Sequence, residues 1–291
     1  MATNDMPALV ETGWLADHLA DGDIRVFDCM VKLEQGPQGV TLTSGREDWA
    51  RAHILGSGFL DLLADLSDRS SRFNAMLPPA EQFAEALGRA GVGPGTRVVL
   101  YDRGGNMWAA RIWWMLRCFG FDAAAVLDGG WGKWTAEHRQ VSDAPPTYPP
   151  ARFEARPRPG LMADKAEVLA ALGADDVVLV NALAPAIHSG EAAPYGRAGR
   201  IPGSVNVPAM SLVDPATGAY RPPQALREAF EAAGALGGKR VIAYCGGGIA
   251  ASSDALALTL LGVEDVAVYD GSLSEWIADP ACPLETDAGR A

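Results

Sequence analysis

The chain has 291 residues, of which 48% are hydrophobic, and a formal net charge of −12 at pH 7. That length and apolar content are enough for two buried cores, so we expect two domains. The acidic balance argues against general binding to nucleic acid or to anionic membranes, because both would repel the chain at long range.

The four cysteines, Cys29, Cys118, Cys245 and Cys282, form no CxxC pair and no zinc-type spacing. We therefore expect no disulfide framework, no metal and no cofactor. The N-terminus lacks a basic region followed by an apolar stretch, and no window approaches the roughly 18 apolar residues of a membrane span. These features favour a cytoplasmic protein.

Extended apolar runs alternate with helical patterns along the whole chain. In chain order, strands are predicted at 24–27, 97–101, 177–180, 240–244 and 266–269, and helices at 80–90, 109–119, 163–172, 223–233 and 250–261. Such alternation builds mostly parallel sheets flanked by helices, which is an α/β fold.

The two halves of the chain resemble each other. Tyr101 with the glycines that follow it matches Tyr244 with its glycines, at an offset of 143 residues, and Asp128 matches Asp270 at an offset of 142. A proline-rich stretch separates the copies and is typical of a linker. We expect an N-terminal domain at 1–144, a linker at 145–160 and a C-terminal domain at 161–291.

The most informative feature is Cys245, which follows a predicted strand and precedes three glycines and a helix. Consecutive glycines let main-chain N–H groups converge into an anion-binding nest, and the helix N-terminus adds positive potential. Such surroundings favour a thiolate at neutral pH, and in a parallel sheet this position lies where ligands bind. We expect a nucleophilic sulfur accessible to solvent, held by the N–H groups of the loop. The expected loop comprises Gly246, Gly247, Gly248, Ile249 and Ala250.

Taken together, the motifs resemble the two-domain rhodanese-like sulfurtransferases, which include thiosulfate and 3-mercaptopyruvate sulfurtransferases. The resemblance spans nearly the whole chain and rests on the segments 76–78, 110–115, 127–130, 199–208, 244–248 and 269–276. It implies two tandem rhodanese-like domains, of which the N-terminal one is inactive because Asp102 replaces the cysteine. It also implies that Cys245 takes a sulfane sulfur as a persulfide and passes it to an acceptor such as thioredoxin, glutathione or cyanide, without a cofactor.

The loop departs from both groups within this family. Members selective for thiosulfate usually carry basic residues after the cysteine, whereas this chain has Gly246 and Gly247. The pattern is closer to the Cys-Gly-Ser-Gly of mercaptopyruvate enzymes, although Gly247 replaces the serine and removes any proton relay through its hydroxyl. The resemblance therefore slightly favours 3-mercaptopyruvate over thiosulfate as the donor.

The usual donor-binding arginine after the strand at 177–180 is also absent, since the chain continues with Asn181. Arg197 lies near a second arginine of the mercaptopyruvate enzymes, and Arg200 replaces the histidine of a common His-Ile-Pro-Gly motif. We expect Arg197 or Arg200 to anchor the donor's carboxylate or sulfonate, because arginine suits bidentate recognition. His188 is a candidate loop ligand or proton donor, and Asn181 is expected to fix the loop.

Two other functions remain open from the sequence. A non-enzymatic carrier could hold a persulfide on Cys245 and deliver it to a protein partner. A cysteine-dependent phosphatase would need an arginine six positions after the cysteine, and Ala251 stands there instead, so the phosphoryl group would lack its bidentate clamp.

Overall fold

The computed structural model describes residues 6–36 and 39–287. The described chain forms two compact units, one from Met1–Ser70, Leu77–Arg158 and Asp214–Tyr220, and the other from Ser71–Met76, Pro159–Val213 and Arg221–Ala291. Each unit is built on a five-stranded parallel sheet flanked by helices. The α/β fold expected from the alternating pattern is therefore confirmed.

The N-terminal unit has the strand order β1-β8-β7-β2-β6. Its sheet strands are β1 (Leu9–Val10), β2 (Ile24–Asp28), β6 (Gly58–Phe59), β7 (Arg97–Tyr101) and β8 (Ala124–Leu127), and its helices are α1 (Thr12–His18), α2 (Arg46–Arg51), α3 (Ala80–Arg89), α4 (Met107–Cys118) and α5 (Gly130–Ala136). Two antiparallel pairs, β3 (Val31–Gly36) with β4 (Gly39–Ser44) and β5 (His53–Ile54) with β9 (Val141–Ser142), were not predicted. Most residues of the central strands are apolar and buried, because helices cover both faces of a parallel sheet.

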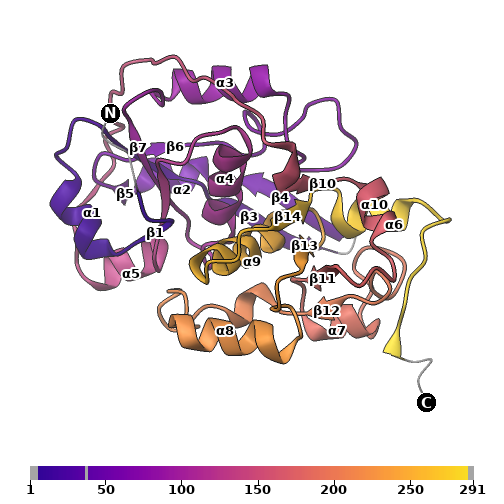
Figure 1. The fold of residues 1–291 in the computed structure, drawn as a ribbon. Coiled ribbons are helices and arrows are strands. Elements are labelled where there is room, and N and C mark those ends of the chain that lie inside the picture. Colours follow the sequence, from indigo (N-terminus) through magenta and orange to yellow (C-terminus); the bar gives the residue numbers. More distant parts are fainter. Residues whose placement is uncertain (1–5, 37–38, 288–291) are drawn as a thin grey trace. The chain divides into compact units, whose positions relative to one another are not determined.

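The C-terminal unit repeats this arrangement with the order β10-β14-β13-β11-β12. Its strands are β10 (Met162–Ala163), β11 (Val177–Asn181), β12 (Val205–Asn206), β13 (Arg240–Tyr244) and β14 (Val266–Tyr269), and its helices are α6 (Lys165–Ala170), α7 (Pro185–Ser189), α8 (Pro223–Ala232), α9 (Ile249–Leu260) and α10 (Ser272–Ala278), with short 3-10 turns at Pro159–Leu161 and Ala209–Ser211. In Figure 1, α9 runs beside β13 and β14, the strands it contacts. β13 is central, so the residue after it, Cys245, lies at the carboxyl edge of the sheet.

Half of the predicted boundaries coincide with the observed ones, and the others differ by one or two residues. The helix predicted at 163–172 is shortened at its start to Lys165, because Asp164 acts as its N-cap and accepts a 2.8 Å hydrogen bond from the Glu167 amide. None of the helices within 6–36 and 39–287 is long and apolar enough to cross a membrane.

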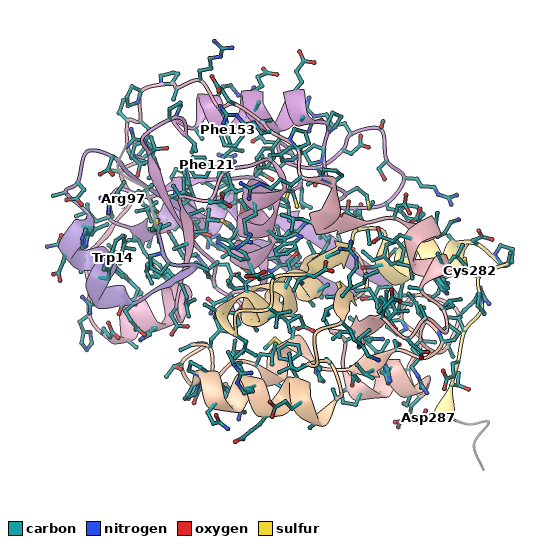
Figure 2. All side chains as sticks on the ribbon, in the orientation of Figure 1. Trp14, Arg97, Phe121, Phe153, Cys282 and Asp287 are labelled. Carbon is teal, nitrogen blue, oxygen red and sulfur yellow. The ribbon has the colours of Figure 1, made fainter. Side chains whose placement is uncertain are left out.

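Most of the proline-rich segment, residues 145–158, belongs to the N-terminal unit, whereas Pro159 and Gly160 belong to the C-terminal unit. The Tyr148 hydroxyl donates to the Gly56 carbonyl at 2.5 Å and accepts from the Val26 amide at 3.1 Å. Farther along, the Phe153 ring lies 5.6 Å from that of Phe121 (Figure 2). This segment is therefore held to the N-terminal unit by side-chain packing and hydrogen bonds.

Candidate active site

The loop after β13 is tied to the start of α10 by main-chain hydrogen bonds. The Cys245 carbonyl accepts from the Leu273 amide at 3.0 Å, and the Gly246 carbonyl accepts from the amide and the hydroxyl of Ser274 at 3.0 and 2.6 Å. Gly248 caps α9 with a φ of 77°, a left-handed conformation that glycine adopts without cost. The chain can therefore turn from strand to helix within three residues of Cys245.

The hydroxyl of a buried serine, Ser272, is bonded to both ends of this turn. The Ser272 hydroxyl accepts hydrogen bonds from the Cys245 amide at 3.0 Å and the Gly248 amide at 3.1 Å, and it donates to the Tyr269 carbonyl at 2.7 Å. Ser272 is fully buried and has a φ of 47°, which is unusual for a residue with a side chain. These three hydrogen bonds offset the backbone strain and fix both ends of the loop.

The matching loop of the N-terminal unit shows what this backbone arrangement can bind. The Asp102 carboxylate accepts from the amides of Gly104 and Asn106 through one oxygen and from those of Trp108 and Ala109 through the other, at 2.8 to 3.0 Å. A strand, a tight turn and a helix N-terminus thus surround an anion with four N–H donors. In the first copy a carboxyl group occupies the position of Cys245; burial raises the pKa of Asp102, and the four N–H donors act in the opposite direction by favouring the carboxylate.

The two loops differ in length by one residue. Helix α4 is capped by Asn106, four residues after Asp102, whereas α9 is capped by Gly248, three residues after Cys245. The internal offset between the copies therefore changes from 143 to 142 inside the loop itself.

The amides of the second loop have no acceptor of their own. In the part of the chain that the structure describes, the N–H groups of Gly246, Gly247, Ile249, Ala250 and Ala251 make no hydrogen bond. In the first loop the corresponding groups at the helix start are occupied by Asp102. The second loop is thus an unfilled set of donors beside a cysteine, which suits a negatively charged sulfur.

The thiol itself is more enclosed than the sequence led us to expect. Cys245 is 2% exposed, so the expectation of a sulfur open to solvent is not met. Tyr195 packs against the next residue of the loop, because its hydroxyl oxygen would lie 2.0 Å from a Cβ built on Gly246.

Asn181 ends β11 directly beside Tyr244, the residue before the cysteine. Its side-chain Nδ2 donates to the Tyr244 hydroxyl at 3.1 Å, and its side-chain Oδ1 accepts from the Leu183 main-chain amide at 2.9 Å. The Tyr244 hydroxyl also contacts the Ser204 hydroxyl at 2.7 Å and accepts from the Ile201 amide at 3.1 Å. This buried network fixes the strand ends beneath the loop.

Arg197 and Arg200 both contact the C-terminal segment. Arg197 donates to the carbonyls of Asp279 and Cys282, at 3.2 and 3.1 Å. The side chain of Arg200 is 5% exposed and pairs with Glu285 and Asp287, each at 2.8 Å. Cys282 and Asp287 mark this segment in Figure 2. Much of the hydrogen-bonding capacity of both guanidinium groups is thus taken up by protein acceptors.

His188, on α7, belongs to the same region, because its carbonyl accepts from Arg200 at 3.1 Å. Burial, together with the positive charge of Arg200, lowers the pKa of His188 to about 4. The imidazole is therefore neutral at pH 7. The structure brings the Cys245 loop together as expected, whereas Arg197, Arg200 and His188 gather around the C-terminal segment.

Three residues of the site were missed from the sequence. Ser272 and Ser274 make hydrogen bonds to the loop, and Tyr195 packs against Gly246. Ser272 did have a signal in the sequence, because it matches Gly130 at the offset of 142. Gly130 has a φ of 50°, so this position needs a left-handed backbone, and a serine in place of glycine indicates that its side chain has a role there. Tyr195 lies 50 positions from Cys245, in a segment without periodicity, and had no comparable signal.

Comparisons with known proteins agree with this geometry. The model of the family described as Rhodanese-like domain matches residues 11–137 and again 164–279. The chain is 33% identical over 280 residues to 3-mercaptopyruvate sulfurtransferase of Escherichia coli K12, covering 95% of this chain and 97% of the relative. It is 34% identical over 275 residues to thiosulfate sulfurtransferase of Bos taurus, covering 92% and 91%. The crystal structure of SseA from Escherichia coli, a 3-mercaptopyruvate sulfotransferase by its description, superposes with a TM-score of 0.82 at 30% identity, covering 92% of this chain and 99% of SseA.

Proposed function

Because this chain belongs to the rhodanese-like family and is a sulfurtransferase, we propose that it moves a sulfane sulfur from 3-mercaptopyruvate or thiosulfate through a persulfide on Cys245. The acceptor is a thiophile, with thioredoxin, glutathione and cyanide as the candidates. Of the other cysteines, Cys29 is fully enclosed, and burial raises the pKa of its thiol, so it stays protonated. Cys245 has the unfilled N–H groups beside it.

The proposed reaction has two displacement steps. With 3-mercaptopyruvate, the Cys245 thiolate attacks the donor sulfur, the carbon–sulfur bond breaks, and its electron pair becomes the enolate of pyruvate. The proton of the donor thiol passes to that enolate, which leaves pyruvate and a persulfide anion. With thiosulfate, the sulfur–sulfur bond breaks and sulfite leaves with the electron pair. In the second step the acceptor attacks the outer sulfur and the Cys245 thiolate is regenerated.

The observation that carries this proposal is the pair of matched loops. One holds a carboxylate on four main-chain N–H groups, and the other leaves its N–H groups without acceptors next to a cysteine. Both the thiolate and the persulfide are anions at this position, so the same donors stabilise the enzyme before and after the first step. N–H donors that stabilise both anions suit a cysteine that takes up a sulfur atom and releases it again in each catalytic cycle.

We propose 3-mercaptopyruvate as the preferred donor. The loop has no basic side chain after the cysteine, so it offers less to the doubly charged thiosulfate than to a singly charged keto acid. For Arg197 or Arg200 to anchor the donor's carboxylate, the guanidinium must exchange a protein acceptor that now holds it for the donor.

The test is steady-state turnover of both donors with cyanide as acceptor. We expect the catalytic efficiency to be higher with 3-mercaptopyruvate, and Cys245→Ser to remove turnover with both donors. Cys29→Ser is the matched control, because it replaces a buried cysteine outside the loop. A higher efficiency with thiosulfate would reverse the donor preference. Turnover that survives Cys245→Ser would refute the assignment of the nucleophile, and a wild-type protein that forms the persulfide without turning over either donor would be a carrier.

A further inference from the structure

Tyr195 occupies the space where the residue after the cysteine would carry its side chain. A Cβ built on Gly246 would lie 2.0 Å from the Tyr195 hydroxyl oxygen, 2.4 Å from Cζ and 2.6 Å from Cε1. Gly246 does not have a positive φ, so its backbone conformation is open to any residue. Glycine is needed here for space alone, and the space is taken by Tyr195.

The ring and the hydroxyl of Tyr195 have different surroundings. The ring packs against the core cluster that contains Ile201 and Tyr244. Burial, and after it the negative charge of a Cys245 thiolate, raises the pKa of Tyr195 to about 12. The hydroxyl therefore keeps its proton at neutral pH and is a neutral hydrogen-bond donor.

That donor is unused within the protein. Among residues 6–36 and 39–287, no hydrogen bond to the Tyr195 hydroxyl is formed by side chain or main chain. Tyr195 is half-buried, and its hydroxyl oxygen remains in contact with solvent. A polar group that is fixed by its ring beside the nucleophile, and that has no partner, is available to a bound molecule.

We propose that Tyr195 binds the sulfur donor, and that its hydroxyl donates a hydrogen bond to the oxygen on which charge develops as the carbon–sulfur bond of an α-keto thiol breaks. The inference rests on the proposed function and names the residue that recognises the donor. Tyr195 supplies at this loop the polar side chain that Gly246 lacks. The hydrogen bond from this neutral hydroxyl becomes stronger as a ketone oxygen turns into an enolate oxygen. A sulfonate oxygen is charged before the reaction starts, so there the gain is smaller.

The step balances without a co-reactant. The Cys245 thiolate forms a sulfur–sulfur bond, the carbon–sulfur bond breaks, and the electron pair moves onto the ketone oxygen, which accepts the hydrogen bond from Tyr195. The thiol proton of the donor then goes to the enolate carbon. Tyr195 keeps its own proton throughout, and it has no task when the acceptor removes the outer sulfur.

The experiment measures the two half-reactions separately by rapid quench and mass spectrometry. Tyr195→Phe removes the hydroxyl and keeps the ring. We expect it to slow persulfide formation from 3-mercaptopyruvate about 10- to 100-fold, as for a lost hydrogen bond to a developing charge. Formation from thiosulfate and discharge of the persulfide to cyanide should change by less than about threefold, because neither reaction forms the enolate oxygen to which Tyr195 donates. Tyr148→Phe is the matched control. It too removes a tyrosine hydroxyl, one that lies in the N-terminal unit and makes hydrogen bonds there, and it should change neither half-reaction.

A double-mutant cycle tests the geometry itself. Gly246→Ala should impair persulfide formation in the wild-type background, because the new methyl group displaces Tyr195. In a Tyr195→Ala background the same substitution should add less than about threefold, since the overlapping atoms are gone. The proposal is overturned if Tyr195→Phe slows both donors or both half-reactions equally, if it slows neither, or if Gly246→Ala is equally harmful in both backgrounds. A wild-type protein that forms no Cys245 persulfide with either donor removes the proposed function, and this role of Tyr195 with it.

Discussion

The Ser272 hydroxyl, at the start of α10, holds the two ends of the Cys245 loop. It accepts from the buried amides of Cys245 and Gly248 and has no solvent exposure. Ser272→Ala leaves both amides without an acceptor, and each buried unpaired group costs about 1 to 3 kcal/mol. We therefore expect Ser272→Ala to lower the free energy of unfolding of the C-terminal unit by about 2 to 6 kcal/mol.

Ser272→Gly separates the hydrogen bonds from the backbone strain. It loses the same acceptor, but glycine adopts a φ of 47° freely. The left-handed conformation costs a residue with a side chain about 1 kcal/mol or more. Ser272→Gly should consequently be more stable than Ser272→Ala by about that amount while remaining less stable than the wild type.

Hydrogen exchange followed by mass spectrometry provides the assay, because it reports on the loop locally. The peptide containing Cys245 and Gly248 should lose protection at those two amides in both variants, and urea unfolding should rank the three proteins as wild type, then glycine, then alanine. The reasoning is refuted if both amides stay protected in Ser272→Ala, or if the glycine variant is the least stable of the three.

Three other substitutions have expected outcomes. Arg200→Met removes a nearly buried guanidinium that pairs with Glu285 and Asp287 and should destabilise the chain by about 3 kcal/mol, measured by urea unfolding; an unchanged midpoint would contradict this. Asp102→Ala removes the acceptor of four amides and should lower the stability of the N-terminal unit by about 3 kcal/mol or more, while Cys245 still forms a persulfide; a variant as stable as the wild type would count against the first loop as an anion site. The pKa of His188 is lowered from 6.5 to about 4, so the unfolded chain binds more protons in that range, and stability should fall as the pH falls from 6.5 to 4. His188→Gln should flatten that part of the stability profile, and a profile as steep as that of the wild type would show that other groups are responsible.

The five strands and five helices that were predicted could be found because local patterns determine them. The runs that became β7 and β13 are apolar after a first arginine, α8 buries Leu226 and Phe230 four positions apart, and α9 is apolar over most of its length, so their location needed no knowledge of distant residues. The internal duplication located Cys245 within the fold for the same reason. The antiparallel pair of β3 (Val31–Gly36) and β4 (Gly39–Ser44) was missed.

The parts of the site that were not predicted depend on contacts between distant residues. Ser272 is 27 positions from the amide it holds, and Tyr195 is 51 from the glycine it overlaps. The sequence shows that position 246 is glycine, and it is the fold that shows the cause to be a tyrosine side chain. Arginine positions 197 and 200 were assigned to the donor by resemblance, while their observed partners lie in the C-terminal segment, at positions that carry no motif.

The most direct test of the central claim is the mass of the protein after brief incubation with 3-mercaptopyruvate. The account predicts that the intact chain gains one sulfur atom, that peptide mapping places it on Cys245, and that cyanide removes it as thiocyanate. A gain of sulfur at another cysteine, or no gain in a chain that still turns over the donor, would contradict the account.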